Sequence, residues 1–288
     1  MYCKADLHIH TSISDGQHTP SEVVGMAAAE GVGLMAITDH DSVAGLEEGE
    51  AAAKAAGIAF VPGIEISVKG GHEMHILGYC VERSDPRLVQ ASAEFARLRE
   101  EREGRIVVFL AKQGIPITHE AVRRHVKGKV TGRAHFARAI VDAGFAANTG
   151  EAFRRYLDIP EFKSVDRPKP SPEHGIALIR GAGGVPVLAH PNTLRMDSAE
   201  LDAALAELAG LGLQGLECHY STNSGGQTRL YLALAHKYGL LVTGGSDFHG
   251  EDVKKGVEIG SGINGSLKFD GLGVEERLWA LAAGNRQA

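Results

Sequence analysis

Short apolar runs alternate with stretches of helical periodicity along residues 5–82. The runs ADLHIH, LMAITDH and AFVPGIEIS have the length of strands, and the stretches TPSEVVGMAAAEGV and LEEGEAAAKAAGI between them have helical spacing. This alternation predicts βα units and a largely parallel sheet. Thr19 and Pro20, followed by Glu22, combine an N-cap, a first-turn proline and an early acid, so a helix should begin near residue 20.

Helical signals dominate from residue 82 to residue 170. Leu88, Ala91 and Phe95 lie at spacings of three and four, as on the apolar face of a helix. The βα rhythm then returns with GIALIRGAGGVPVLAHP. We therefore predict a barrel interrupted by an insertion, with a first barrel segment at 1–82, a helical cap at 83–170 and a second barrel segment at 171–288.

Length and composition narrow the class of protein. The chain has 288 residues, 43% of them hydrophobic, which is enough for a barrel core with an insertion. Its formal net charge of −6 provides no global positive field, so we expect no long duplex nucleic acid as a ligand. Cys3, Cys80 and Cys218 are too few and too widely spaced for a disulfide framework. With neither a leader-like segment nor an apolar run of about 18 residues, we expect a cytoplasmic protein and no membrane span.

Histidines and acids recur at or just beyond the ends of the apolar runs. In a strand, His8 and His10 would share one side while Leu7 and Ile9 face the other. Strand ends of parallel α/β folds meet on one face, so the whole set should converge there. One ion takes about four to six ligands, and the set therefore suggests about two to three divalent ions, with Glu65 as a bridge. The candidate ligands are His8, His10, Asp15, His40, Glu65, His75, His190, Asp247 and His249.

Other residues near the strand ends allow two interpretations. A lone histidine is more often a hydrogen-bonded surface or core residue, but so many at strand ends are hard to attribute to chance. Asp41 could act beside the ligands as a catalytic or ligand-orienting carboxylate, or it could cap the next helix. In LECHY, residues 216–220, we interpret Cys218 as structural, and His219 could contact substrate.

A basic run without acids lies in the predicted insertion. Residues 123–138 contain no Asp or Glu, and arginine can bind a phosphate through two parallel hydrogen bonds. The run predicts a local anion-binding patch, although a solvated surface is the alternative for most of its members. The run consists of Arg123, Arg124, His125, Lys127, Lys129, Arg133, His135 and Arg138.

Six segments resemble, in order, the motifs of the PHP family, the polymerase and histidinol phosphatase domain. They are DLHIHTSISDG, AITDHDSVAG, PGIEIS, MHILGY, LAHP and GGSDFHG, and they cover both predicted barrel segments. The resemblance implies a distorted (β/α)7, TIM-like barrel with a helical cap insertion. It also implies divalent ions, with manganese expected and iron or zinc as alternatives.

The resemblance assigns a ligand set to each of three ions. No position of the family's pattern is missing from this sequence. The implied sets are His8, His10, Glu65 and Asp247 for one ion, Asp15, His40 and His249 for a second, and Glu65, His75 and His190 for the third.

The predicted insertion resembles that of one group within the PHP family. The segment TGRAHFARAIVDAG, residues 131–144, is similar to the cap of stand-alone PHP phosphoesterases that act on nucleoside 3′,5′-bisphosphates, and of relatives that trim short RNA from the 5′ end. By analogy, Arg133 and His135 would hold a substrate phosphate. The expected activity is hydrolysis of a phosphate monoester of a small nucleotide, most simply a nucleoside 3′,5′-bisphosphate, by a metal-bound hydroxide.

Three other functions remain open at this point. A 5′-to-3′ exoribonuclease on short RNA would use the same cap, and a histidinol-phosphate phosphatase would use the same metals. A non-enzymatic PHP module belongs to a different class, but such modules often lack ligands. Amide hydrolysis is disfavoured, because the basic run points to phosphate. The expected partner is a nucleotide or a short oligoribonucleotide, and the sequence indicates no protein partner.

Overall fold

Seven strands form one sheet that curls into a nearly closed barrel. The computed structural model describes residues 3–70, 73–126 and 131–287. The sheet runs in the order β1 to β7, and a parallel bridge between Ile9 and Phe248 brings its two edges together. The barrel expected from the sequence is confirmed. The strands are β1 (Ala5–Asp6), β2 (Leu34–Ile37), β3 (Ala59–Ser67), β4 (His75–Tyr79), β5 (Val185–Leu188), β6 (Gly215–Tyr220) and β7 (Leu241–Gly245).

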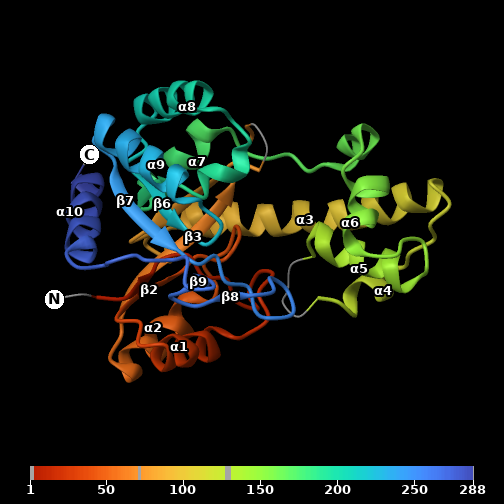
Figure 1. Cartoon of the computed structure of the whole chain (residues 1–288), viewed down its shortest axis with the longest axis horizontal. Coiled ribbons are helices and arrows are strands. Elements are labelled where there is room, and N and C mark those ends of the chain that lie inside the picture. The colour runs from red at the N-terminus through yellow and green to blue at the C-terminus, as the bar shows by residue number, and fades with distance from the viewer. Residues whose placement is uncertain (1–2, 71–72, 127–130, 288) are drawn as a thin grey trace.

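Helices pack around the barrel, and the last of them covers the end where the strands begin (Figure 1). Val274 and Leu278 of α10 belong to the same buried cluster as Ala5, Leu34 and Leu241, which lie near the first residues of their strands. The opposite rim is therefore the open one. The helices are α1 (Pro20–Ala29), α2 (Leu46–Ala56), α7 (Pro172–Gly181), α8 (Ser198–Gly210), α9 (Gly225–Lys237) and α10 (Val274–Gln287), with a 3₁₀ turn η3 (Pro191–Leu194) and a small hairpin of β8 (Val257–Glu258) and β9 (Gly262–Ile263).

The first helix begins where the sequence predicts it. Thr19 is the N-cap of α1, and its side chain and that of Glu22 bond to each other's backbone amides as a capping box. Asp197 and Glu200 begin α8 in the same way. Local hydrogen bonding therefore defines both helix starts.

The strand β4 departs from the regular βα repeat, because it runs antiparallel to both neighbours. Only residues 68–74 connect β3 to β4, and a parallel crossover needs about a dozen residues or more. His75 at the start of β4 therefore pairs with Ser67 at the end of β3. The expectation that His75 follows the end of a strand is wrong. The reversal nevertheless brings His75 to the open rim.

The strand β1 is shorter than the apolar run that predicts it. It ends at Asp6, whose carboxylate accepts hydrogen bonds from the amides of Ser246 at 2.8 Å and Gly260 at 2.7 Å. The expected alternation is wrong for Leu7 and Ile9, which pack in two different core clusters. The period of two no longer applies once strand pairing ends.

Between β4 and α7 the chain forms a helical cap with its own core. The long helix α3 runs from the barrel out to the cap (Figure 1). Leu110, Phe136, Ile140 and Leu157 pack together there, apart from the two barrel clusters. A helical insertion is thus present, while its exact boundaries at 82 and 170 remain predictions. Its elements are α3 (Pro86–Lys112), α4 (His119–Arg123), α5 (Arg133–Asp142), α6 (Thr149–Ala152), the π-helical turn η1 (Phe153–Leu157) and the 3₁₀ segment η2 (Pro160–Val165).

Two further observations concern the described residues as a whole. None of their helices combines the length and the apolar character needed to cross a membrane. Cys3, Cys80 and Cys218 are free thiols. Burial raises the pKa of the Cys218 thiol, and Cys218 packs in the core, in line with a structural role.

The contact between β7 and His8 leads to the first prediction. A Cβ atom at Gly245 would lie 2.3 Å from the Cβ and 2.5 Å from the backbone nitrogen of His8. Gly245→Ala must therefore displace His8, and we expect a loss of about 1–3 kcal/mol in unfolding free energy together with less bound metal. Thermal unfolding and elemental analysis measure both effects.

The control for this prediction is Gly104→Ala in α3. A Cβ atom there meets nothing within 4 Å, so the change should be neutral or stabilise by about 0.5–1 kcal/mol. Full stability and a full metal content in the Gly245 variant would contradict the prediction.

Candidate metal centre and the adjoining cavity

The carboxylate of Glu65 lies at the centre of the open rim. Glu65 is on β3 and is 1% exposed. Imidazole nitrogens surround its two oxygens at 2.9 to 3.4 Å, which is a suitable place for a bridging ligand. They belong to His8, His10, His40, His75 and His190.

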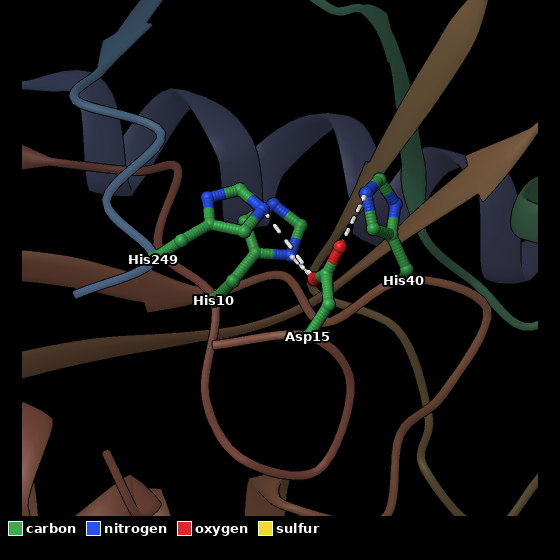
Figure 2. Close-up of side chains that lie close together, drawn as sticks. All are labelled: His10, Asp15, His40 and His249. Carbon is green, nitrogen blue, oxygen red and sulfur yellow. Dashed lines mark ion pairs between the residues drawn. The ribbon is translucent and has the colours of Figure 1, made fainter. Parts of the chain in front are cut away.

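Two further acids complete the cluster. Figure 2 shows Asp15 between His249 and His40, with oxygen–nitrogen distances of 3.4 Å and 3.8 Å. The Oδ1 atom of Asp247 lies 3.3 Å from Nδ1 of His249 and 3.4 Å from Nε2 of His10. All nine predicted ligands are therefore brought together.

The distances divide the nine residues into overlapping groups. One group contains His10, Asp15, His40 and His249, which is the second predicted set with His10 added. His190 falls in a group with His8 and Asp247, although it also lies 2.9 Å from Glu65. The division of the ligands among separate ions remains a prediction.

Several buried nitrogens of the cluster have no hydrogen-bond partner among the described residues. They are Nε2 of His8, both ring nitrogens of His10 and Nδ1 of His40. Three of them lie 2.9 to 3.4 Å from a Glu65 oxygen but without hydrogen-bond geometry. Imidazole nitrogen and carboxylate oxygen are donor atoms that manganese, iron and zinc accept. The residues therefore fit divalent ions, which would satisfy these nitrogens.

The carboxylates and imidazoles of the cluster shift one another's pKa values. Burial acts to raise the pKa of Glu65, but the imidazoles of His40 and His75 outweigh it and hold this pKa well below its usual range. Asp15 is held ionised in the same way, with His40 as its strongest counter-charge. Burial lowers the pKa of His10 to about 3 and that of His75 to about 4. Burial also acts to lower the pKa of His8 and of His40, but there the carboxylates prevail. Glu217 and Glu65 hold the pKa of His8 well above its usual value, and Glu65 and Asp15 raise that of His40 to about 9. Because metal binds ionised carboxylates and neutral imidazoles, metal binding must displace protons from these two histidines.

Glu217 supports the cluster, although its place in the sequence did not predict this role. Its side chain is fully buried, and Oε1 accepts a hydrogen bond from Nδ1 of His8 at 2.9 Å. Its Oε2 accepts from the amide of His190 at 2.6 Å. Leu216 and Cys218, its neighbours on β6, both pack in the buried cluster under the helices. Because neighbouring strand residues point to opposite faces, this pattern could have predicted that Glu217 points into the barrel.

Asp39 and Tyr220 are further supports that were not predicted. Asp39 accepts hydrogen bonds from the Thr11 amide at 2.8 Å and the Ser14 hydroxyl at 2.5 Å, so it fixes the loop that carries Asp15. The Tyr220 hydroxyl donates to Oδ2 of Asp247 at 2.7 Å. These partners are distant in sequence, so no local pattern indicated them.

Asp41 does not cap the following helix. The N-cap of α2 is Gly45, without a side-chain hydrogen bond, so that interpretation is wrong. Instead, Oδ2 of Asp41 lies 2.6 Å from Nη2 of Arg99 and 2.6 Å from Nη2 of Arg167. Both arginines belong to the predicted insertion, so Asp41 joins the barrel to the cap. A catalytic role for Asp41 remains a prediction.

His219 lies beside the cluster rather than in it. Its ring is 5.6 Å from that of Phe269, centroid to centroid, and a β-bulge separates it from Glu217. The bulge shifts the register, and the next residue, Tyr220, is the one that reaches Asp247. A contact between His219 and substrate remains a prediction.

The basic run of the cap does not form a patch of uncompensated cations in the described residues. Acids from outside the run neutralise several members, which the linear pattern could not show. Arg138 contacts the carbonyl of Asp252, and Lys127 and Lys129 lie outside the described residues. The pairs are Arg123 with Glu103, Arg124 with Glu120 and His125 with Asp142.

Arg133 and His135 begin α5 next to the barrel rim. Arg133 is paired with Asp158 at 2.9 Å and with Glu73. His135 is 2% exposed, and its Nδ1 accepts a hydrogen bond from the Gly132 amide at 2.9 Å. Burial lowers the pKa of His135 to about 4, which keeps this nitrogen free to accept. Contact of the two side chains with a phosphate remains a prediction.

A cavity of about 670 Å³ joins the cluster to the cap. Asp15, His40 and His75 line it on the barrel side. On its remaining wall cations outnumber the acids Glu73, Asp158 and Asp166. Such a wall beside a metal cluster suits a small polyanion. The cationic residues are Lys69, Arg99, Arg102, Arg133, Arg167, Lys169 and Arg195.

Known proteins resemble the chain over most of its length. The PHP domain matches residues 6–159. A 3′,5′-nucleoside bisphosphate phosphatase from Chromobacterium violaceum is 35% identical, over 85% of this chain and 86% of its own length. A 5′-3′ exoribonuclease from Haemophilus influenzae is 34% identical, over 85% of this chain and 90% of its own. The structure of an amidohydrolase from Chromobacterium violaceum, with bound sulfate and no metal, has a TM-score of 0.82 and 32% identity over 97% of each chain.

The fold, the cluster and these similarities together define the class of protein. The chain belongs to the PHP family. It is a metal-dependent phosphoesterase, an enzyme that hydrolyses phosphate esters. The non-enzymatic alternative is thereby set aside.

Glu217 provides the second prediction. Glu217→Gln preserves the shape of the side chain but removes the charge that faces His8, so metal affinity should fall about 10–100-fold. Competition with a chelator measures this affinity. Glu207→Gln on the exposed side of α8 is the control and should change nothing. An unaltered affinity in the Glu217 variant would show that this carboxylate does not support the cluster.

Proposed function

We propose that the protein hydrolyses a phosphate monoester of a small nucleotide, with a nucleoside 3′,5′-bisphosphate as its preferred substrate. The observation that carries the proposal is one cavity lined both by the metal cluster and by a wall of cations. One phosphate can be cleaved at the cluster while the wall binds the other. The similarity to a bisphosphate phosphatase supports the proposal, as does the sulfate bound by a related structure, since sulfate has the shape of phosphate.

The nine cluster residues would hold about two to three divalent ions, manganese first, with iron or zinc as alternatives. When bound, such ions acidify a water nucleophile and neutralise charge on the phosphoryl oxygens. The proposed sets are His8, His10, Glu65 and Asp247, then Asp15, His40 and His249, and finally Glu65, His75 and His190.

Side chains around the cluster orient the ligands and the substrate. Glu217 holds Nδ1 of His8, so that Nε2 faces Glu65 at 3.4 Å. Arg133 from the cap would bind the phosphate that is spared, and His135 would hold the turn that carries Arg133. Binding of the spared phosphate then aligns the phosphate that is cleaved.

A second candidate function is 5′-to-3′ exoribonuclease activity on short RNA. A second cavity of about 530 Å³ shares His40 and Arg99 with the first, so a longer substrate could extend through both. The similarity to a 5′-3′ exoribonuclease also favours it. The ratio of rates on a nucleoside 3′,5′-bisphosphate and on a 5′-phosphorylated trinucleotide decides between the two.

The third prediction concerns metal content. The purified protein should hold two to three divalent ions per chain and lose hydrolysis on chelation. His40→Ala should lower turnover by orders of magnitude while circular dichroism stays unchanged, because His40 lies at the rim rather than in the core. Fewer than one ion per chain after metal supplementation would rule out a multinuclear centre.

The fourth prediction separates the bisphosphate from other substrates. Arg133→Ala should reduce the catalytic efficiency on a nucleoside 3′,5′-bisphosphate far more than on an aryl phosphate, which has no second phosphate. Loss of a charge-assisted contact should cost roughly 1.5–3 kcal/mol, about tenfold to over a hundredfold. Equal losses on both substrates, or a preference of the unmodified enzyme for histidinol phosphate, would overturn the substrate assignment.

A further inference from the structure

Arg167 is a buried arginine that faces the cavity with part of its guanidinium group unpaired. It follows η2, lines the cavity and is 5% exposed. Its Nη2 donates to Oδ2 of Asp41 at 2.6 Å, whereas Nη1 is buried and has no hydrogen-bond partner among the described residues. A buried charged donor without an acceptor is unfavourable, and a bound anion would supply the acceptor.

The carboxylate beside Arg167 is shared with a second arginine. Arg99 donates two hydrogen bonds to the same Oδ2 atom of Asp41, at 2.9 and 2.6 Å. Lys169 lines the same cavity, where the charges of Asp166 and Glu73 act on it without a close salt bridge among the described residues. Seven cations and four acids line the cavity, which leaves an excess of positive charge.

The other cap arginines at the cavity are better compensated. Arg133 contacts both Asp158 and Glu73, and Arg102 lies 3.1 Å from Asp166. Burial lowers the pKa of Arg102 to about 10, and the neighbouring cations act in the same direction. Arg167, with a buried nitrogen that has no acceptor among the described residues, is therefore a better candidate for binding an anion than Arg133, which is paired with two acids.

We propose that Arg167 and Lys169 are the main subsite for the phosphate that the reaction spares, and that Asp41 positions Arg167 and Arg99 for this task. This inference rests on the proposed function, because it names the residues that bind the second phosphate of that substrate. Arg167 uses one guanidinium nitrogen for Asp41 and offers the other to the phosphate. Arg133, which lines the same cavity, adds a further contact.

The backbone of Asp41 fixes the position of the subsite relative to the candidate metal ligands. Asp41 has a φ of 56°, a left-handed conformation that aspartate and asparagine tolerate better than most residues. Its amide donates to the carbonyl of Glu65 at 2.8 Å, and its Oδ1 accepts from the amide of Ser67 at 3.1 Å. The strand that carries Glu65 therefore also fixes the carboxylate that holds Arg167.

The main test is Arg167→Met, measured with adenosine 3′,5′-bisphosphate and with 4-nitrophenyl phosphate. The kcat/KM on the bisphosphate should fall about tenfold to a hundredfold further than on the aryl phosphate, mainly through a higher KM. Arg155→Met is the matched control, since Arg155 is paired with Glu151 on the exposed surface of the cap. It should leave both rates unchanged, and metal content is measured for every variant.

The role of Asp41 is tested with Asp41→Asn, which retains the size of the side chain. A positioning role predicts a higher KM for the bisphosphate with a smaller change in kcat and with metal content retained. A merely structural role would lower the rates on both substrates together.

A binding measurement separates failure of this inference from failure of the proposed function. If the unmodified enzyme does not hydrolyse the bisphosphate, the proposed function is wrong, but the anion subsite can still be tested with sulfate. Sulfate should raise the thermal midpoint of the unmodified enzyme and of Arg155→Met more than that of Arg167→Met. Equal sulfate effects in all three proteins, or equal losses of Arg167→Met on the two phosphate substrates, would overturn the inference.

Discussion

The attraction between one buried carboxylate and the imidazoles around it is the interaction on which the rest of the site depends. Glu65 is nearly inaccessible to solvent, yet it stays ionised because the imidazoles of His40 and His75 face it. Burying so many ionisable groups is unfavourable unless each has a partner. The barrel meets this condition by bringing the candidate ligands to one rim, and hydrogen bonds to Glu217 and Asp39 fix His8 and the loop that carries Asp15. The unpartnered nitrogens that remain fit divalent ions.

The barrel and the cap contribute opposite charges. The barrel supplies acids and imidazoles, while the insertion supplies most of the cations that line the cavity. A net charge of −6 therefore says little about the local field beside the cluster. Asp41 is the contact between the two parts, because its carboxylate holds Arg99 and Arg167 from the cap. The position of the cap and the electrostatics of the cavity thus depend on the same group.

The sequence predicted features that follow from local periodicity, and it failed where partners are distant in the chain. The nine candidate ligands converge because strand ends in a βα repeat meet on one rim, and His75 lies at that rim although the direction of its strand was not foreseen. Signals within a few residues, such as Thr19 and Glu22, also predicted a helix start correctly. In contrast, Arg167 pairs with a residue 126 positions away, and Glu103 neutralises part of a run that looked free of acids. Residue spacing contains no information about such pairs.

The most direct test of this account is anomalous diffraction at the manganese absorption edge, from crystals of the protein grown with manganese. The account predicts at least two anomalous peaks in contact with the cluster, one of them against the carboxylate of Glu65. Peaks confined to other parts of the molecule, or no peaks in crystals of a protein that still hydrolyses phosphate esters, would contradict it.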